Sequence, residues 1–162
     1  LRSLAKTPRY QAACEALCKL PAVGLLTALV FLTELGELTR FANRRQVAAY
    51  LGLSPAGAES GDRDDRKGHI TRQGPSRVRK VLCQAMWTAI RVDAGIRAAW
   101  ERIRGPRPQR GKKACVALMR QLGIRLWHVA LGAGVSHELV ARPIPPPRWI
   151  DAPRATAVQQ AL

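Results

Sequence analysis

One serine stands in a short segment that is rich in cations. Ser60 and Gly61 end a run of small and apolar residues, and seven Lys or Arg residues follow between Gly61 and Lys80. A serine hydroxyl is a nucleophile, and positive charge stabilises phosphate oxygens while bonds to phosphorus exchange. Guanidinium groups are well suited to this because they bind phosphate oxygens in pairs. The side chains expected to supply the charge are Arg63, Arg66, Lys67, Arg72 and Arg77.

Other chemistries fit this segment poorly. A hydrolase nucleophile elbow needs glycine two positions before and two after the serine, where this chain has Ala58 and Asp62. A calcium loop starting at Asp62 would need glycine at the position of Lys67. The alternative to phosphoryl transfer is that Ser60 is an ordinary residue of a solvated loop.

The composition predicts a polyanionic partner. The 162 residues hold 27 Lys and Arg against 11 Asp and Glu, which gives a formal charge of +16. A charge so far from zero favours binding to nucleic acid or to an acidic surface. The longest apolar run, Ala22–Leu32, is shorter than the roughly 20 residues that a membrane span needs. We therefore expect no membrane partner and a cytoplasmic protein.

Four cysteines lie in segments predicted to be helical, namely Cys14, Cys18, Cys83 and Cys115. No second Cys or His pair follows the first at the spacing of a zinc site. We expect buried, reduced thiols, because disulfides are rare in the cytosol.

The first half of the chain predicts three helices. The first covers Pro8 to Leu17, and a second runs from the turn at Leu20–Gly24 to about Leu35. Asn43 and Gln46 have the spacing of a capping box, which predicts a short helix through Tyr50. From Gly52 to Gln73 no periodicity persists, so we expect a long irregular loop with a short hairpin around His69 and Ile70.

The second half predicts a long helix, a basic connection and a last helix. Gly74-Pro75 begins what we expect to be the longest helix, bent or ended at Gly95 and continued by an apolar stripe to Arg104. One face of this helix is polar, with Arg77, Lys80, Gln84, Thr88 and Arg91 at helical spacing. The last helix runs from about Lys112 to Leu131, with Cys115, Leu118, Leu122, Leu126 and Val129 turned inward. We expect Trp87, Trp100 and Trp127 to lie in the core.

The fold class predicted is mainly α, with a helical domain over residues 1–134. Residues 135–162 are rich in proline, which removes backbone donors, and are expected to form an extended or disordered tail.

Two further segments could contact phosphates. The run from Leu20 to Gly24 resembles the turn of a helix-hairpin-helix element, in which backbone N–H groups near Gly24 bind a phosphate. The alternative, slightly favoured, is a tight turn between packed helices. The basic connection provides the second segment. Its cations Arg110, Lys112 and Lys113, together with the basic stripe of the long helix that includes Lys80, could form a surface for backbone phosphates, and the alternative is an ordinary solvated loop.

The order of these elements resembles the C-terminal transposase domain of the bridge-RNA-guided insertion-sequence family, relatives of the pilin-gene-inverting recombinase. The resemblance covers roughly residues 17–130. It is carried by Leu20-Pro-Ala-Val-Gly24, Thr27-Ala28, Phe41, Gln46, Ala49-Tyr-Leu-Gly-Leu-Ser-Pro55, Ser60-Gly61, Lys67-Gly-His-Ile-Thr-Arg-Gln-Gly74, Arg77-Val-Arg79 and Lys112-Lys-Ala. The chain departs from the family pattern at Ala22, where glycine is usual, and at Pro75, where asparagine is frequent.

The resemblance implies a DNA transposase in which Ser60 forms a covalent link to a DNA phosphate during strand exchange. It also implies a guide RNA, a homo-oligomer when full length, and an N-terminal RuvC-like domain whose four acidic residues bind magnesium. A bacterial, nucleoid-associated location is implied as well. We find no counterpart of that domain in this sequence, so we expect no cofactor in this chain and a RuvC-like partner on the same or another protomer. The alternative functions are a noncatalytic nucleic-acid-binding module and an RNA-contacting assembly domain.

Overall fold

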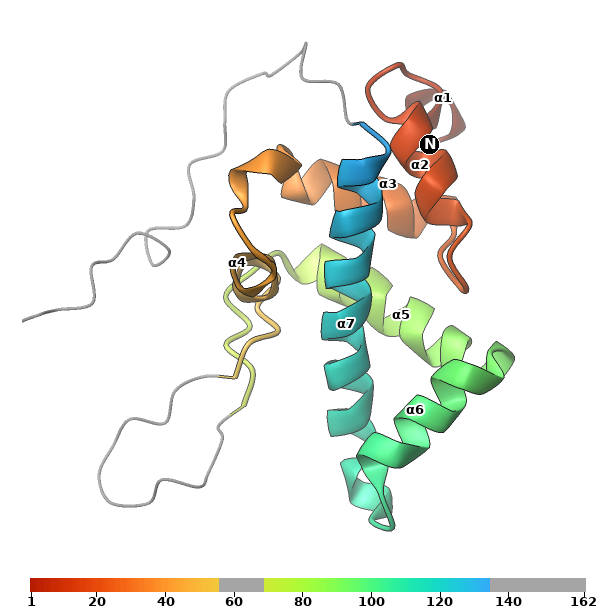
Figure 1. The fold of residues 1–162 in the computed structure, drawn as a ribbon, viewed down its shortest axis with the longest axis vertical. Helices are drawn as coiled ribbons and strands as arrows, with labels where there is room; N and C mark the ends of the chain where they lie inside the picture. Colours follow the sequence, from red (N-terminus) through yellow and green to blue (C-terminus); the bar gives the residue numbers. More distant parts are fainter. Residues whose placement is uncertain (56–68, 135–162) are drawn as a thin grey trace, which may run out of the picture.

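The computed structural model describes residues 1–55 and 69–134, and this part of the chain is mainly helical, as predicted (Figure 1). It contains no β-strand within those ranges, and its one antiparallel bridge joins Pro55 to Ile70. The elements in chain order are α1 (Arg2–Ala5), α2 (Gln11–Cys18), α3 (Leu25–Leu35), the 3-10 turn η1 (Leu38–Arg40), α4 (Arg44–Tyr50), α5 (Ser76–Val92), α6 (Ala94–Arg104), the 3-10 turn η2 (Pro108–Arg110) and α7 (Gly111–Gly132).

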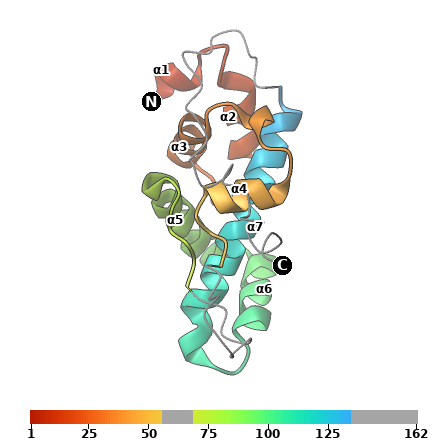
Figure 2. The same ribbon diagram turned by 90° about the vertical axis from the view of Figure 1, so that its left-hand side faces the viewer.

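Helix α7 is the axis around which the other helices pack. It contacts α2, α4, α5 and α6, and Figure 2 shows α4 lying across it. Of the inward positions predicted for α7, Cys115, Leu118 and Leu126 are buried, while Leu122 and Val129 are half-buried. The prediction that the longest helix begins after Pro75 is wrong, because α7 has 22 residues and α5 has 17.

The core lies where α2, α3, α5 and α7 meet. Leu17, Phe31, Leu82 and Leu126 are among its fully buried side chains. Burying a side chain of this size contributes about 1.5–3 kcal/mol each. α3 is apolar on nearly all sides and mostly buried, as its composition predicts, although Leu26 is exposed.

The capping box predicted for α4 is present. The Asn43 side chain accepts hydrogen bonds from the backbone nitrogens of Arg45 and Gln46, at 2.9 and 3.1 Å. The Gln46 side chain reaches back to accept from the Ala42 nitrogen at 2.7 Å. Together these bonds satisfy backbone donors that the first helical turn leaves free, and they fix where α4 begins.

The break between α5 and α6 lies at Asp93, two residues before the predicted Gly95. Asp93 has an extended backbone, and its carboxylate accepts a hydrogen bond from the Ile96 nitrogen at 2.9 Å. An Asp side chain at a helix N-terminus stabilises the new helix enough to end the old one. Arg97 secures the junction because it donates to the carbonyl oxygens of Ile90 and Arg91.

Two predictions about burial need correction. Trp127 is buried and Trp100 is half-buried, but Trp87 lies at the surface with 38% of its area exposed. All four cysteines are free thiols, yet only Cys14 and Cys115 are buried, because Cys18 falls on the outer side of the last turn of α2.

None of the helices within the described ranges is long and apolar enough to cross a membrane.

Candidate nucleic-acid interface

The two ends of the serine-bearing segment are paired with each other. The Thr71 nitrogen donates to the Ser54 carbonyl at 3.0 Å, and the Arg72 nitrogen donates to the Gly52 carbonyl at 3.2 Å. Together with the bridge between Pro55 and Ile70, these bonds form a short antiparallel pair, which we call the loop base (residues 52–55 and 69–74). In the sequence, its two arms are separated by a segment that contains the predicted site residues Ser60, Arg63, Arg66 and Lys67. These residues lie outside the described residues.

Two glycines allow the arms of the loop base to approach closely. A Cβ added to Gly52 would lie 2.9 Å from the Gly74 nitrogen, and Gly52 also has a left-handed φ of +66°. A Cβ added to Gly74 would lie 1.7 Å from the Tyr50 carbonyl oxygen. Only glycine fits at these positions without moving the backbone.

Arg79 of α5 fastens the loop base to the helical core. Its Nη1 atom donates to the Leu51 carbonyl at 3.2 Å and to the Gly74 carbonyl at 2.5 Å. Burial lowers the pKa of the Arg79 guanidinium, and the nearby positive charge of Arg72 lowers that pKa further. No role was predicted for Arg79 from the sequence, although it lies in the Arg77-Val-Arg79 run. Its position one helical turn after Pro75 was the feature of the sequence that could have pointed to a contact with the preceding segment.

Three predicted cations lie in this base or in the helix that follows it. Arg72 is exposed and has a left-handed φ of +55°, which is uncommon for a residue with a side chain. Arg77 and Lys80 are exposed on the first turns of α5, on the polar face that the sequence predicts. We call Arg72, Arg77 and Lys80 the α5 cation group.

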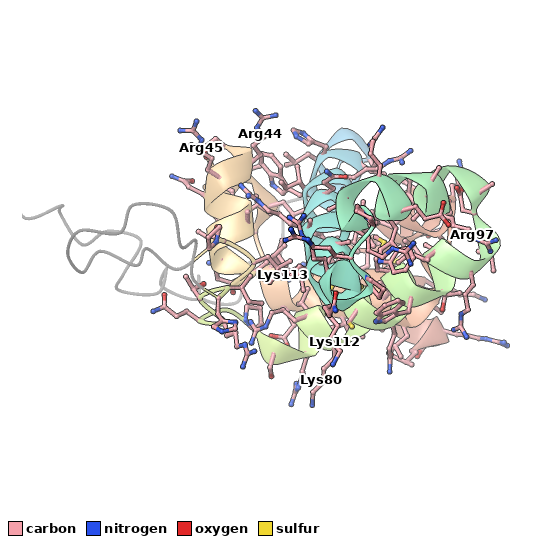
Figure 3. The ribbon with its side chains drawn as sticks, turned by 90° about the horizontal axis from the view of Figure 1, so that it is seen from below. Arg44, Arg45, Lys80, Arg97, Lys112 and Lys113 are labelled. Carbon is pink, nitrogen blue, oxygen red and sulfur yellow. The ribbon has the colours of Figure 1, made fainter. Side chains whose placement is uncertain are left out.

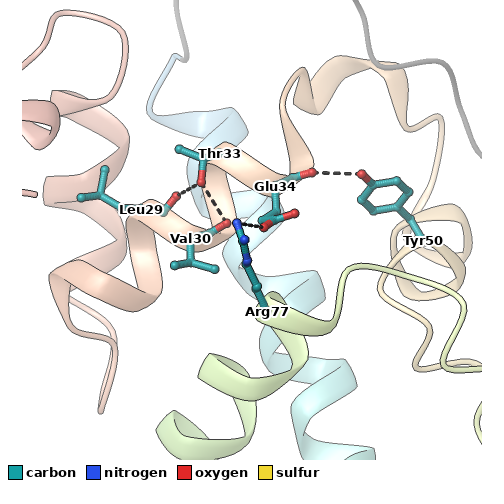
Figure 4. A network of polar contacts seen from close by, with 6 residues as sticks. All are labelled: Leu29, Val30, Thr33, Glu34, Tyr50 and Arg77. Carbon is teal, nitrogen blue, oxygen red and sulfur yellow. Dashed lines mark hydrogen bonds and ion pairs between the residues drawn. The ribbon is translucent and has the colours of Figure 1, made fainter.

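Arg77 is positioned by an ion pair with the end of α3 (Figure 4). Its Nη1 atom lies 3.6 Å from Oε1 of Glu34, and 81% of the Arg77 side chain stays exposed. The Tyr50 hydroxyl donates to the Glu34 carbonyl at 2.9 Å, which joins α4 to the same end of α3. An exposed ion pair stabilises a fold little, so Arg77 remains available to an anionic ligand.

A second group of cations lies at the N-terminal end of α7. Arg110, Lys112 and Lys113 are exposed around its start, where Figure 3 shows the two lysines. The turn is held because the Trp100 indole nitrogen donates to the Gly111 carbonyl at 3.1 Å. Leu51, the residue just before the loop base, packs against Gly123 of α7. Gly123 is 11 residues farther along α7 than Lys112. At 1.5 Å per residue, Lys112 is about 16 Å along the helix axis from the place where Leu51 meets α7.

Gly24 also stands apart from the α5 cation group. It precedes the first residue of α3, is exposed, and has no side chain capping its helix. Glu34 and Arg77 lie at the opposite end of α3, about 15 Å away at the helical rise. In the preceding turn Ala22 has a left-handed φ of 58°. This explains why the helix-hairpin-helix motif, which this run resembles, has glycine at that position.

Sequence reasoning missed one further pair of cations. Arg44 and Arg45 begin α4, are exposed, and point outward in Figure 3. Two adjacent arginines after a capping Asn were the available signal. Arg97, also labelled there, is different because its guanidinium bonds to backbone carbonyls.

The chain is similar to known proteins of one family. Residues 14–101 match the family described as Transposase IS116/IS110/IS902. The chain is 32% identical over 139 residues to "Putative transposase y4qE" of Sinorhizobium fredii, covering 71% of this chain and 35% of that protein. It is 35% identical over 133 residues to "Putative transposase y4rJ" of the same organism, covering 75% and 33%. It is 28% identical over 118 residues to the "Transposase for insertion sequence element IS1111A" of Coxiella burnetii, covering 70% and 32%. The chain thus spans about a third of the length of these relatives.

Proposed function

The chain belongs to the IS116/IS110/IS902 family of transposases, and we propose that it is the part of such an enzyme that binds DNA and supplies a serine for strand exchange. The observation that supports this most is the loop base. Gly52, Gly74 and Arg79 hold together the two ends of the segment that carries Ser60, directly beside Arg72 and the start of α5. The cations of this region can bind a DNA backbone, as a serine nucleophile on this segment requires.

The proposed reaction exchanges one ester of phosphorus for another. The Ser60 Oγ forms a bond to phosphorus and gives up its proton, while one P–O bond to deoxyribose breaks and its oxygen takes up a proton. Attack by the freed hydroxyl of another strand reverses these events and releases the serine. The phosphodiester energy is kept in the covalent intermediate, so strands rejoin without another energy source.

The cations have supporting roles in this proposal. Arg63, Arg66, Lys67, Arg72 and Arg77 position the DNA or stabilise charge on the phosphate oxygens. Lys80 extends this surface along α5, and the group at Arg110, Lys112 and Lys113 binds more distant phosphates. We also keep Gly24 as a proposed phosphate contact through backbone N–H groups.

Partners beyond DNA follow from the resemblance and are proposed on that ground. They are a guide RNA, a second protomer and a RuvC-like domain that binds magnesium. Among the residues the structure describes, no three acidic, His or Cys side chains lie together as a metal site.

A noncatalytic nucleic-acid-binding module is the second candidate. The exposed cations Arg44, Arg45 and Lys80 favour it, because they provide a binding surface that does not need Ser60. A covalent protein–DNA adduct separates the two functions, since a binding module forms none.

The test is Ser60→Ala in a full-length parent transposase. We expect recombination and the covalent adduct to disappear while DNA affinity stays within about twofold. Ser76→Ala is the matched control, because Ser76 is an exposed serine beside the same cations. Recombination that survives Ser60→Ala would show that the nucleophile is a different group.

A further inference from the structure

Trp87 is an exposed aromatic side chain within the polar face of α5. Its exposed fraction is 38%, against 5% for Trp127. Trp100 and Trp127 both donate their indole N–H to a backbone carbonyl, at 3.1 and 2.9 Å. Within the described ranges Trp87 makes no such bond, and it is the most exposed of these three tryptophans.

The Trp87 ring is packed against a second tryptophan. Its centroid lies 6.3 Å from that of Trp100, and the two rings meet edge to face at 65°. Trp100 is itself fixed by its bond to Gly111 and by the Arg104 guanidinium, 4.7 Å from its ring centroid. An aromatic ring that is already positioned loses little conformational freedom when a ligand stacks on it.

Two cations and a glutamine are exposed near Trp87 on α5, and the apolar Val92 is exposed beyond them at the end of the helix. Lys80 lies two turns before Trp87, Gln84 one turn before and Arg91 one turn after, all exposed on neighbouring positions of α5. α5 contains no acidic residue. At the helical rise, Gln84 and Arg91 are each within about 6 Å of Trp87 along the axis. Figure 3 shows Lys80 pointing outward from this helix.

We propose that Trp87 is a stacking platform for an unpaired base, with Lys80 and Arg91 binding the phosphates on either side. The proposal rests on the proposed nucleic-acid binding and adds the kind of strand that is bound. A single-strand site of this type combines aromatic rings, on which bases stack, with cations that follow the backbone. Bases inside a duplex already stack on one another, so an exposed ring selects unpaired nucleotides of DNA or RNA.

A protein contact is the competing explanation for an exposed tryptophan. The charge of the surroundings argues against it, because protein interfaces place aromatic residues in an apolar centre that is poor in lysine. Trp87 instead has a cation on each side along α5.

The test measures binding of the full chain to four oligonucleotides of equal length. They are single-stranded DNA, single-stranded RNA, the same DNA backbone without bases, and duplex DNA. We expect Trp87→Leu to weaken binding to one or both base-bearing single strands by about 5- to 100-fold. Binding to the base-free strand and to the duplex should stay within about twofold. The comparison of DNA with RNA identifies which strand is preferred.

Trp87→Phe is the matched control, because a smaller ring still stacks and should restore most of the affinity. Quenching of tryptophan fluorescence by the single strand should be largely lost in Trp87→Phe even though the strand still binds. Equal affinity of the original chain for base-bearing and base-free strands would overturn the stacking proposal alone. Loss of self-association in Trp87→Leu with unchanged oligonucleotide affinity would also overturn it. Failure to bind any of the four oligonucleotides would overturn the proposed function as well.

Discussion

Gly74 lies directly against the backbone of Tyr50. The approach is so close that a Cβ built on Gly74 would stand 1.7 Å from the Tyr50 carbonyl oxygen. The atoms that it would meet are all backbone atoms, of Tyr50 and Leu51, which cannot rotate aside as a side chain can. This contact joins the end of α4 to the chain just before α5. It therefore sets where the serine-bearing segment leaves and rejoins the fold.

Gly74→Ala should lower the free energy of unfolding by about 2–3 kcal/mol, since the added methyl forces these backbones apart. Urea denaturation measures the change. Gly24→Ala is the control, because nothing lies within 4 Å of a Cβ at that position. Equal stability of the two variants would show that α4 and the α5 approach are not in close contact.

Arg79→Met should also destabilise the fold, by about 2 kcal/mol, because the Leu51 and Gly74 carbonyls lose a charged donor. Methionine keeps much of the length of the side chain, so the loss reports the hydrogen bonds more than the packing. Arg125→Met, at an exposed position of α7, should change stability by less than about 0.5 kcal/mol. If both substitutions cost the same, Arg79 does not secure the loop base.

Binding to duplex DNA should depend on salt through the α5 cation group. Replacing Arg77 and Lys80 together by alanine should make the slope of log affinity against log salt shallower by about 1–2, since each phosphate contact contributes about 0.9. Arg2→Ala is the control, because Arg2 is exposed on α1 and outside the proposed surface. An unchanged slope in the double variant would mean that these two cations do not bind DNA phosphates.

Stability should fall at alkaline pH because of Cys115. Burial, together with the neighbouring Cys83, raises the pKa of the Cys115 thiol from 9.0 to about 12. Below pH 9.0 the thiol is protonated in both states, so its contribution to stability is fully present there. Between these two values the unfolded chain releases a proton that the folded chain keeps. The free energy of unfolding therefore falls as pH rises, by up to about 1.4 kcal/mol per pH unit from this group.

Urea denaturation of the original chain and of Cys115→Ala, at several pH values from 8 upward, measures this effect. The alanine variant should be less stable at pH 8 because of the cavity it leaves, but its stability should decline less steeply with pH. Parallel declines would show that Cys115 ionises alike in both states.

Several elements could be predicted from the sequence because their causes are local. The capping box of Asn43 and Gln46 spans one helical turn and formed as predicted. The polar face of α5 follows from the helical period alone, so Lys80 and Arg91 are exposed as predicted. The α5–α6 break was misplaced because Gly95 is flexible in any context, whereas Asp93 ends the helix by bonding to Ile96.

The charge of the chain, its helical class and the family motifs around Ser60 are properties of composition and spacing, which the sequence alone determines. The exposure of Trp87 and Cys18, and the role of Arg79, were decided by tertiary structure. Arg79 bonds to the carbonyl of Leu51, 28 residues earlier in the chain, and no local pattern encodes that partner. Trp87 is of a residue type common in protein cores, but Trp100 of α6 meets its ring edge to face and 38% of the area of Trp87 stays exposed. Burial depends on which helices meet, and this is set by the packing of the whole domain around α7.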